Sequence, residues 1–395
     1  MTLPTKVTDT TRTDLDQLVA DRVTEGAHLD FKRQLPTTWD NEAKKRFIAD
    51  LVAFANAGGG DLVFGVDEDS SAAASAVVPQ VFASVDAELR RLQDFVLELA
   101  EPRLPGVQVH PVAATVGAVS GHCIVIRVPQ SWAGPHRSKV NWHFYVRDGL
   151  RNRQLDIPEV KALFLRSDSQ AQRMRDFRAE RLAKISTGQT PVALPVAPKL
   201  VVHAIPTQAA LGQAHIDPTR YTRGRQALPV IGTLPASPVS LNLDGAFAPI
   251  VANGAPPGYT QQFRQGYFEA VWKLTPLGDV PKPVLPGIAY ESYVNQFIGS
   301  VRGQLSQLDI NQDVAVFLSL LDADQAVLAG PHDLGIPGAY STKAFDRKDV
   351  LLPDVLIEAS SSVGRGMRPA YDLMCQAAGF EGSPNYDQTG EWKGK

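Results

Sequence analysis

The sequence contains little cysteine, since only Cys123 and Cys375 occur among its 395 residues. Two cysteines cannot build a disulfide framework or a cysteine-rich zinc site, so we expect both to be buried thiols. No segment approaches the apolar length that spans a bilayer, and residues 1–6 lack the basic cluster and apolar run of a signal peptide. These absences predict a cytoplasmic protein with no membrane partner.

A nucleotide-binding loop is also absent. Gly58, Gly59 and Gly60 are consecutive, but the sequence has no G-x-x-x-x-G-K-[ST] pattern that would bring a lysine and a hydroxyl to a nucleotide. We therefore do not expect an ATPase. Asn56 and the three glycines are interpreted as backbone geometry, because both residue types accept the left-handed conformations of a helix exit.

The composition and length indicate a two-domain globular protein. Hydrophobic residues make up 44% of the chain and charged residues 21%, and 395 residues exceed the size of one ordinary domain. Prolines and small residues at 186–198 predict a linker. We therefore expect a first domain at 1–185 and a second, regulatory or assembly domain at 199–395.

Hydrophobic periodicity predicts both helices and strands in the first domain. The helices are expected at 11–22, 42–55, 84–100 and from 157 to about 185, and the strands at 28–32, 61–66, 107–112, 122–128 and 142–147. There is no regular alternation of strand and helix. This order predicts an α+β fold, not a doubly wound sheet.

The second domain is expected to be a mixed α+β unit as well. Its clearest strands are 199–205 and 313–320, and its helices lie near 288–308 and 367–379. Residues 206–262 are rich in proline, glycine and alanine, which predicts long loops. No motif in this half indicates a chemistry.

Charge is unevenly distributed along the chain. Residues 1–126 carry 11 basic and 18 acidic side chains, residues 127–184 carry 13 and 6, and the formal net charge of the whole chain is -3. A cationic segment beside an acidic one suits a phosphate-backbone substrate. Alternatively, part of the basic segment is the solvated face of one helix, formed by Arg173, Arg175, Arg178, Arg181 and Lys184.

Three carboxylates stand out in the acidic segment. Glu25 and Asp30 lie at the two ends of a short run, and Asp67 follows a strand that contains Gly65. Carboxylates about 4 Å apart repel by about 4 kcal/mol at an effective dielectric of 20, so such a cluster must protonate, spread out or bind a cation. Mg²⁺ or Mn²⁺ would suit these oxygen ligands, and Lys32 could neutralise charge on a phosphorane.

Each of the three residues also has an ordinary structural interpretation. Glu25 could be a surface charge at a helix end, Asp30 a charge that protects an edge strand, and Asp67 a turn residue. Only their combination favours a metal site.

Several segments in series resemble the Schlafen AlbA-like (AlbA_2) family over roughly residues 20–167. The matching segments are residues 25–32, Ala-Phe-Ala-Asn at 53–56, Gly-Gly at 59–60 with Phe-Gly-Val-Asp at 64–67, Val-Pro-Gln-Ser at 128–131 with Pro-His at 135–136, and Phe-Tyr-Val-Arg at 144–147 with Gly149. Each segment is a weak signal, whereas their order makes the resemblance specific.

The resemblance implies a function and a site. Nuclease members of the family cleave RNA, often tRNA-like, with three acids around a metal, and this implies Glu25, Asp30 and Asp67 as catalytic residues and metal ligands. The middle position is commonly glutamate in the family, so Asp30 is a shorter arm. Relatives that pair two such lobes in one chain suggest a homodimer or larger homo-oligomer here, and the family suggests antiphage defence or a stress response.

Basic and aromatic side chains provide candidate nucleic-acid contacts. His28 and His136 are read as ordinary structural histidines, and Trp142 and Tyr145 could stack bases but are expected in the core. The basic candidates, better suited to phosphates than to base edges, are Lys44, Lys45, Arg46, Arg137, Lys139, Arg147, Arg151 and Arg153.

The sequence therefore predicts a metal-dependent endoribonuclease that acts on tRNA or another structured RNA with Mg²⁺ or Mn²⁺. A non-catalytic DNA- or RNA-binding regulator is the first alternative. A scaffold or interaction protein is the second.

Overall fold

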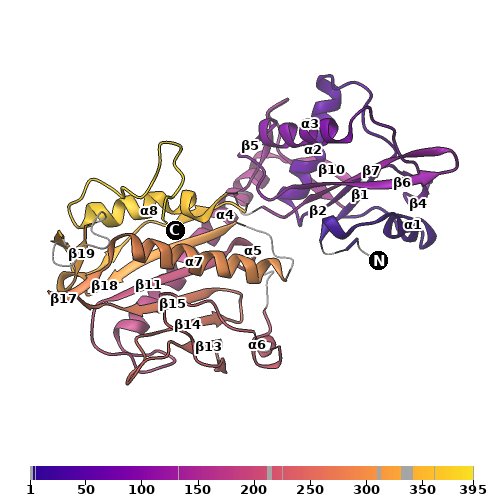
Figure 1. Cartoon of the computed structure of the whole chain (residues 1–395). Coiled ribbons are helices and arrows are strands. Elements are labelled where there is room, and N and C mark those ends of the chain that lie inside the picture. The colour runs from indigo at the N-terminus through magenta and orange to yellow at the C-terminus, as the bar shows by residue number, and fades with distance from the viewer. Residues whose placement is uncertain are drawn as a thin grey trace. The chain divides into compact units, whose positions relative to one another are not determined.

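The computed structural model describes residues 3–4, 6–131, 133–210, 216–224, 226–308, 313–330, 341–359 and 361–394. The chain divides into two compact units, Met1–Ala171 and Gln172–Lys395. Both units combine helices with sheets, which confirms the α+β class (Figure 1). Within the described ranges, no helix has the length and apolarity needed to cross a membrane.

The described part of the first unit begins with a short helical turn and contains ten strands. Its elements are η1 (Val7–Asp9), α1 (Arg12–Ala20), β1 (Leu29–Lys32), α2 (Asn41–Asn56), β2 (Gly60–Phe64), β3 (Val66–Glu68), β4 (Ala74–Val77), α3 (Val85–Glu98), β5 (Ala100–Glu101), β6 (Gln108–Val116), β7 (Val119–Val128), β8 (Arg137–Ser138), β9 (Tyr145–Asp148), β10 (Arg151–Gln154) and α4 (Ile157–Ser186).

Its main sheet has the strand order β1-β2-β7-β6, so β1 is an edge strand. β1 runs parallel to β2, with Asp30 opposite Leu62, whereas β2, β7 and β6 are antiparallel neighbours. Shorter pairs, β3 with β4, β5 with β8 and β9 with β10, surround this sheet. Because β1 is an edge strand, Arg147 of β9 can contact the Leu29 carbonyl of β1 and the Gly26 carbonyl of the segment that precedes β1.

Local sequence signals fix the two helices that pack on this sheet. Thr11 and Asp14 form a capping box at the start of α1, and the Asp40 carboxylate accepts a hydrogen bond from the Ala43 N–H, 2.8 Å away, at the start of α2. α2 packs its apolar stripe on one face of the sheet, and α1 packs on the other. The side chains of β1 therefore alternate between the two layers.

Glycine positions the strand that follows β2. Gly65 has a φ of +97°, and a side chain there would meet Cys123. The predicted strand at 61–66 consequently ends at Phe64, and the chain restarts as β3, which pairs with β4 in a different sheet. Asp67 thus lies inside β3 and not in a turn.

The second unit is built on a larger sheet. Its elements are β11 (Lys199–Pro206), α5 (Thr207–Ala210), α6 (Thr219–Arg223), β12 (Ser240–Leu241), β13 (Gly245–Pro249), β14 (Gly258–Phe263), β15 (Phe268–Lys273), β16 (Thr275–Leu277), β17 (Val280–Leu285), α7 (Gly287–Ser306), β18 (Val314–Leu321), η2 (Ala323–Gln325), β19 (Val327–Ala329), β20 (Thr342–Ala344), β21 (Val350–Leu351), β22 (Val355–Ile357) and α8 (Val363–Ala377).

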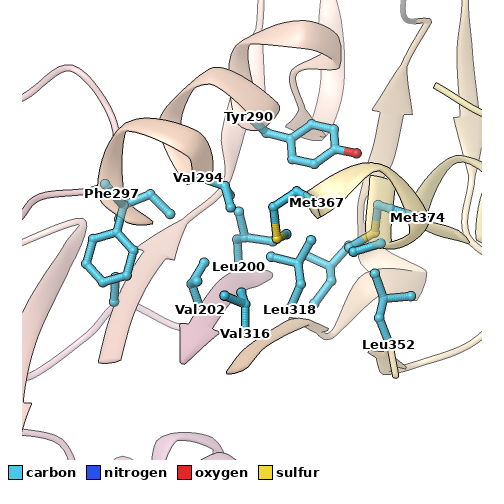
Figure 2. Close-up of a cluster of buried hydrophobic side chains, with 14 of the residues drawn as sticks. Leu200, Val202, Tyr290, Val294, Phe297, Val316, Leu318, Leu352, Met367 and Met374 are labelled. Atoms are coloured by element: carbon cyan, nitrogen blue, oxygen red, sulfur yellow. The ribbon is translucent and has the colours of Figure 1, made fainter. Parts of the chain in front are cut away.

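Strands β12-β13-β14-β15-β11-β18-β21 follow one another in this sheet, and β22 also pairs with β18. One face is apolar and is covered by α7 and α8. Figure 2 shows Tyr290 and Val294 of α7 and Met367 of α8 around Leu200 and Leu318 of the sheet. This cluster is the main core of the unit.

The opposite face of the large sheet carries an ionic network. Arg181 of α4 donates from Nε and Nη2 to the two carboxylate oxygens of Glu269, each 2.9 Å away, and His203 Nε2 and Tyr259 Oη are also bonded to Glu269. Arg178 of the same helix reaches Ser319 and the Leu352 carbonyl. The second half of α4 is therefore fixed to the second unit by arginines.

The structure differs from the sequence prediction at the boundary between the units. The division falls inside α4, and Val192 and Leu194 of the predicted linker pack with Leu182 and Ile185 on the large sheet. Arg181 is buried, so the basic side chains of α4 are not one solvated face.

Two further stretches differ as well. Residues 206–262 include β13 and β14, which are strands of the large sheet, although residues 211–215 and 225 lie outside the described part. In the first unit, β9 begins only at Tyr145, and Trp142 lies in a turn with a φ of +63°. Periodicity did not indicate these boundaries, because short strands among prolines and a polar turn give no repeating pattern.

Candidate acidic site of the first unit

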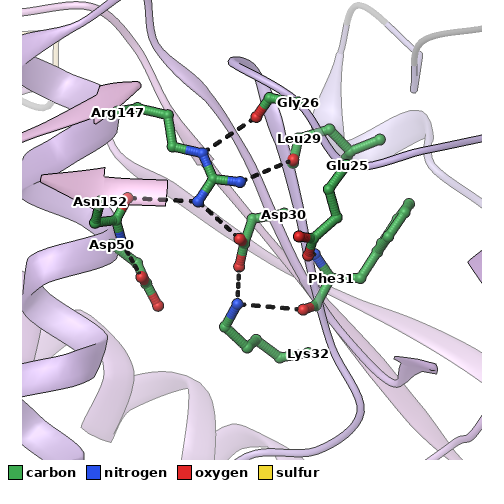
Figure 3. A network of polar contacts seen from close by, with 9 residues as sticks. All are labelled: Glu25, Gly26, Leu29, Asp30, Phe31, Lys32, Asp50, Arg147 and Asn152. Atoms are coloured by element: carbon green, nitrogen blue, oxygen red, sulfur yellow. Dashed lines mark hydrogen bonds and ion pairs between the residues drawn. The ribbon is translucent and has the colours of Figure 1, made fainter. Parts of the chain in front are cut away.

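β1, α2 and the β9–β10 hairpin bring a group of charged side chains together (Figure 3). Asp30 and Lys32 are two residues apart on β1 and therefore point to the same side, while Phe31 points into the opposite core layer. Asp50 comes from α2, and Arg147 and Asn152 come from the hairpin. We use the term acidic network for six residues: Glu25, Asp30, Lys32, Asp50, Arg147 and Asn152.

Asp30 is buried and doubly paired. Its Oδ1 lies 2.8 Å from Nη1 of Arg147, and its Oδ2 pairs with the Lys32 amino group. The side chains of Asp30 and Arg147 are only 3% and 2% exposed, whereas that of Lys32 is 39% exposed. Of these three groups, Lys32 is the one that solvent or a substrate can reach.

Arg147 also fixes the backbone in front of β1. Its Nε donates to the Gly26 carbonyl at 3.1 Å and its Nη2 to the Leu29 carbonyl at 3.5 Å, and its guanidinium lies over the ring of Phe54. These contacts use the planar donor fork of arginine. Arg147 was predicted to bind nucleic acid, but its burial makes it a positioning residue of the network.

Glu25 approaches the network from the segment before β1. Its carboxylate accepts a hydrogen bond from the Phe31 N–H, 2.6 Å away. Partial burial and the nearby charge of Asp30 raise the pKa of Glu25 above its ordinary value, although the Phe31 hydrogen bond opposes this. Glu25 is thus a carboxylate whose protonated form is favoured by its surroundings.

Asp50 is the most perturbed acid of the network. Burial raises its pKa to about 7, despite the opposing influence of Lys32 and Arg147 and a hydrogen bond from the Asn152 amide. Burial lowers the pKa of Lys32, but Asp50 and Asp30 outweigh it, so the pKa of Lys32 is raised. The network therefore keeps Lys32 charged and lets Asp50 exchange a proton near neutral pH.

The predicted metal ligands do not converge in this structure. Asp67 pairs with Arg33. On the same strand, the charge of Glu68 contributes to the raised pKa of Glu25. Both oxygens of Asp30 already face cations. Among the residues that the structure describes, no three His, Cys, Asp or Glu side chains are grouped so that they could hold a metal ion. The arrangement does not fit the predicted three-carboxylate ligand set.

The seven basic candidates other than Arg147 fall into three groups. Lys44 lies over the ring of Phe95, and Lys45 pairs with Glu42. Arg137 and Arg153 pair with Glu101 and Glu159. No acidic partner within the described residues is seen for the last group, which consists of Arg46, Lys139 and Arg151.

The two histidines and Asn56 have structural contacts. His28 Nδ1 lies 2.8 Å from the Gly59 carbonyl. Burial lowers the pKa of His136 to about 4, and its Nε2 lies 2.6 Å from Ser131 Oγ. The Asn56 amide donates to the carbonyls of His136 and Tyr145 and accepts from the His136 N–H. Asn56 therefore holds the segment that leads to Arg147 through its side chain. The left-handed conformation predicted for this helix exit occurs at Gly59 and not at Asn56, which is the last residue of α2.

The site contains residues that sequence reasoning did not select. Asp50 lies within the predicted helix 42–55, and Asn152 lies in a polar stretch. One signal was present: an aspartate at position 50 among Phe47, Ile48 and Leu51 interrupts the apolar surface of α2. It could not reveal which partners the buried acid would meet.

Comparison with known proteins identifies the domain that carries this network. Residues 25–156 match the model of the Schlafen AlbA_2 family. The first unit thus contains a Schlafen AlbA_2 domain, which confirms the resemblance drawn from the sequence. The comparison with curated proteins found no match.

Two solved structures are similar to part of the chain. One is a protein of Corynebacterium diphtheriae, with 16% identity and a TM-score of 0.24, covering 36% of this chain and 26% of its own. The other is the N-terminal domain of a protein of Nitrosomonas europaea described as related to the ATP-dependent DNA helicase RecG, with 26% identity and a TM-score of 0.23, covering 32% of this chain and 77% of its own. The chain thus spans about a quarter of the first structure's length.

Proposed function

We propose that the first unit processes nucleic acid, and that the acidic network is the reaction centre of an endoribonuclease. The observation that carries this proposal is the pKa of Asp50, raised to about 7 beside a charged and partly exposed lysine. Perturbed acids next to an accessible cation are typical of reaction centres. The AlbA_2 domain supports the nucleic-acid part of the proposal.

The chemistry is assigned to the residues of the network. Lys32 would contact the scissile phosphate and stabilise the negative charge that develops on it. Asp50, which exchanges a proton near neutral pH, would act as the acid or base, directly or through one water. Asp30 and Arg147 would position Lys32, since both are buried.

Mg²⁺ or Mn²⁺ remains the predicted cofactor, and the roles assigned to Lys32 and Asp50 do not require it. The ion pairs of Asp30 and Asp67 would have to be replaced before these carboxylates could bind a metal. Assembly into a homodimer or larger oligomer and a role in antiphage defence also stay predictions drawn from the family.

Cleavage of labelled tRNA by the full chain tests the proposal. We expect cutting that is lost in Lys32→Ala and Asp50→Asn, with plasmid DNA as the second substrate and EDTA, Mg²⁺ and Mn²⁺ as parallel conditions. Glu42→Gln is the matched control, because Glu42 is an exposed acid on α2 whose carboxylate pairs with Lys45, which lies outside the acidic network. Intact tRNA under every condition would contradict the proposal.

Asp67→Asn distinguishes the acidic network from the three-carboxylate metal site as the reaction centre. If the network of Figure 3 is the reaction centre, this variant keeps its activity, because Asp67 pairs with Arg33 outside the network. If the three-acid metal site predicted from the sequence forms with substrate, Asp67→Asn is inactive and EDTA abolishes cutting.

The alternative function is binding without cleavage. It is favoured by the full neutralisation of Asp30, whose two oxygens face Lys32 and Arg147 as in a structural ion pair. A binder shifts RNA or DNA without cutting it, and its affinity falls steeply with salt. A chain that neither binds nor cuts would leave the scaffold interpretation.

A further inference from the structure

Trp142 occupies an unusual position for its residue type. Its side chain is 56% exposed, and its φ of +63° lies in the left-handed region that bulky residues rarely adopt. The Trp142 N–H donates to the Ser138 carbonyl, 2.8 Å away, and the Ser138 N–H donates to the His143 carbonyl, 2.9 Å away. A tight turn thus holds a large aromatic ring in solvent, where it contributes nothing to the core.

The ring of Trp142 is supported from one side by a fixed cation. The guanidinium of Arg137 lies 4.8 Å from the ring centroid. The Glu101 carboxylate holds that guanidinium through two hydrogen bonds, of 3.0 and 2.7 Å. The indole is therefore oriented before any partner arrives, which lowers the entropy cost of stacking on it.

Apart from Val140, which packs against the core, the other side chains of the turn are polar. Lys139 and His143 are exposed, and Asn141 donates to the Tyr145 hydroxyl, 2.7 Å away. The centre of a protein interface is depleted of charged residues, whereas the exposed neighbours of Trp142 in this turn, Lys139 and His143, are polar. An exposed aromatic ring among cations is instead typical of a surface that stacks unpaired bases.

We propose that Trp142, with Arg137 behind it and Lys139 beside it, is a stacking platform for a base of single-stranded RNA. This inference rests on the proposed function and adds how the RNA is held. Trp142 and Arg147 are five positions apart in the chain, so their Cα atoms lie within about 18 Å of each other and the platform lies near the acidic network. A strand stacked on Trp142 would thus be retained close to Lys32.

Equilibrium binding of the full chain to a labelled 2′-O-methyl oligouridine, in EDTA, tests the platform. We expect Trp142→Ala to weaken binding about tenfold and Trp142→Phe to weaken it less than about threefold, because every aromatic ring offers a stacking face. The slope of log affinity against log salt should stay unchanged in both variants, since stacking releases no counterions. Lys139→Met should lower that slope by about 1.

Two variants control for folding and for general loss of apolar surface. Trp142→Gly relieves the left-handed backbone, so it should fold normally and still bind as weakly as Trp142→Ala. Val119→Ala removes another exposed apolar side chain of the same unit and should bind like the wild type.

The outcomes separate the platform from the proposed function. Wild-type affinity in Trp142→Ala and Trp142→Gly, with RNA still bound, overturns the platform alone. If Trp142→Ala changed the mass of the protein assembly in solution and left RNA affinity unchanged, the tryptophan would belong to a protein interface, and the platform would be overturned too. Failure of the wild type to bind any RNA overturns both proposals.

Discussion

Each unit buries a network of ionised side chains, and the two networks neutralise their acids to different degrees. In the second unit, Glu269 is bonded to Arg181, His203 and Tyr259. Burial alone would raise its pKa, but the hydrogen bonds from His203 and Arg181 outweigh burial and lower it to about 2. Asp50 of the first unit has the opposite balance, because burial dominates and raises its pKa to about 7.

This difference separates a structural network from a candidate reaction centre. Glu269 stays ionised at any ordinary pH and fixes α4 to the large sheet. Asp50 is held in surroundings that oppose its charge, which costs stability and leaves a group that can exchange protons. Burial of a carboxylate therefore does not by itself distinguish a structural from a reactive group. The number of hydrogen-bond donors that reach the carboxylate decides between the two.

The largest expected effect comes from removing the acid of the structural network. Glu269→Ala leaves Arg181 buried without its carboxylate, so we expect the second unit to lose about 3–5 kcal/mol of unfolding free energy. Urea unfolding followed by the fluorescence of Trp272, which lies on the same strand, measures it. The double variant Arg181→Met with Glu269→Leu should recover most of the lost unfolding free energy. No recovery would mean that apolar packing cannot replace the ion pair.

Arg147→Ala should have the next largest effect. Asp30 keeps Lys32 as a partner but loses its buried guanidinium, and two backbone carbonyls lose their donor. We expect a loss of about 2–3 kcal/mol in the unfolding free energy of the first unit, partly recovered in Arg147→Lys. An unchanged stability together with a lower salt slope of RNA binding would instead support the phosphate contact predicted from the sequence.

Asp50→Asn should change stability in a pH-dependent way. The folded protein binds the Asp50 proton more tightly than the unfolded chain, so the contribution of this group is fully present below about pH 4 and is lost as the pH rises through about 7. The unfolding free energy of the variant should therefore equal that of the wild type near pH 4 and exceed it near pH 8, by at most about 4 kcal/mol for the shift of the Asp50 pKa to about 7. Denaturant unfolding at the two pH values checks this, and a constant difference between them would refute the raised pKa.

The smallest effect is expected at an exposed arginine–glutamate pair that, like Arg181 and Glu269, is joined by two hydrogen bonds. Arg153 donates to both oxygens of Glu159 at 2.7 Å, but the two side chains are 47% and 34% exposed. We expect Arg153→Ala to leave the midpoint of thermal unfolding nearly unchanged, because water replaces the lost bonds. A cost similar to that of Glu269→Ala would show that burial is not what distinguishes the networks.

Local patterns predicted much of the first unit. The helical periodicity of 11–22 and 42–55 and the strand pattern of 28–32 are properties of short segments, so they can be recognised without tertiary information. Gly65 was predicted to lie within the strand at 61–66, but its left-handed backbone follows the end of β2 at Phe64. Whether β3 continues the strand or joins β4 depends on the contact of Gly65 with Cys123, which lies far along the chain.

The candidate site was predicted only in part. Glu25, Asp30 and Lys32 were selected because they are close in sequence. Asp50 and Asn152 are distant from them and join through the packing of α2 and the β9–β10 hairpin. Trp142 was expected in the core because aromatic residues favour strands, whereas the hydrogen bonds of its turn place it in solvent.

The sequence by itself determined the α+β class, the AlbA_2 domain and the pairing of Asp30 with Lys32 on one face of a strand, because these follow from composition, motif order and two-residue periodicity. Only the tertiary structure decided which acids are neutralised. That outcome depends on how many donors reach a buried carboxylate, and the donors of Asp30, Asp50 and Glu269 come from segments far apart in the chain.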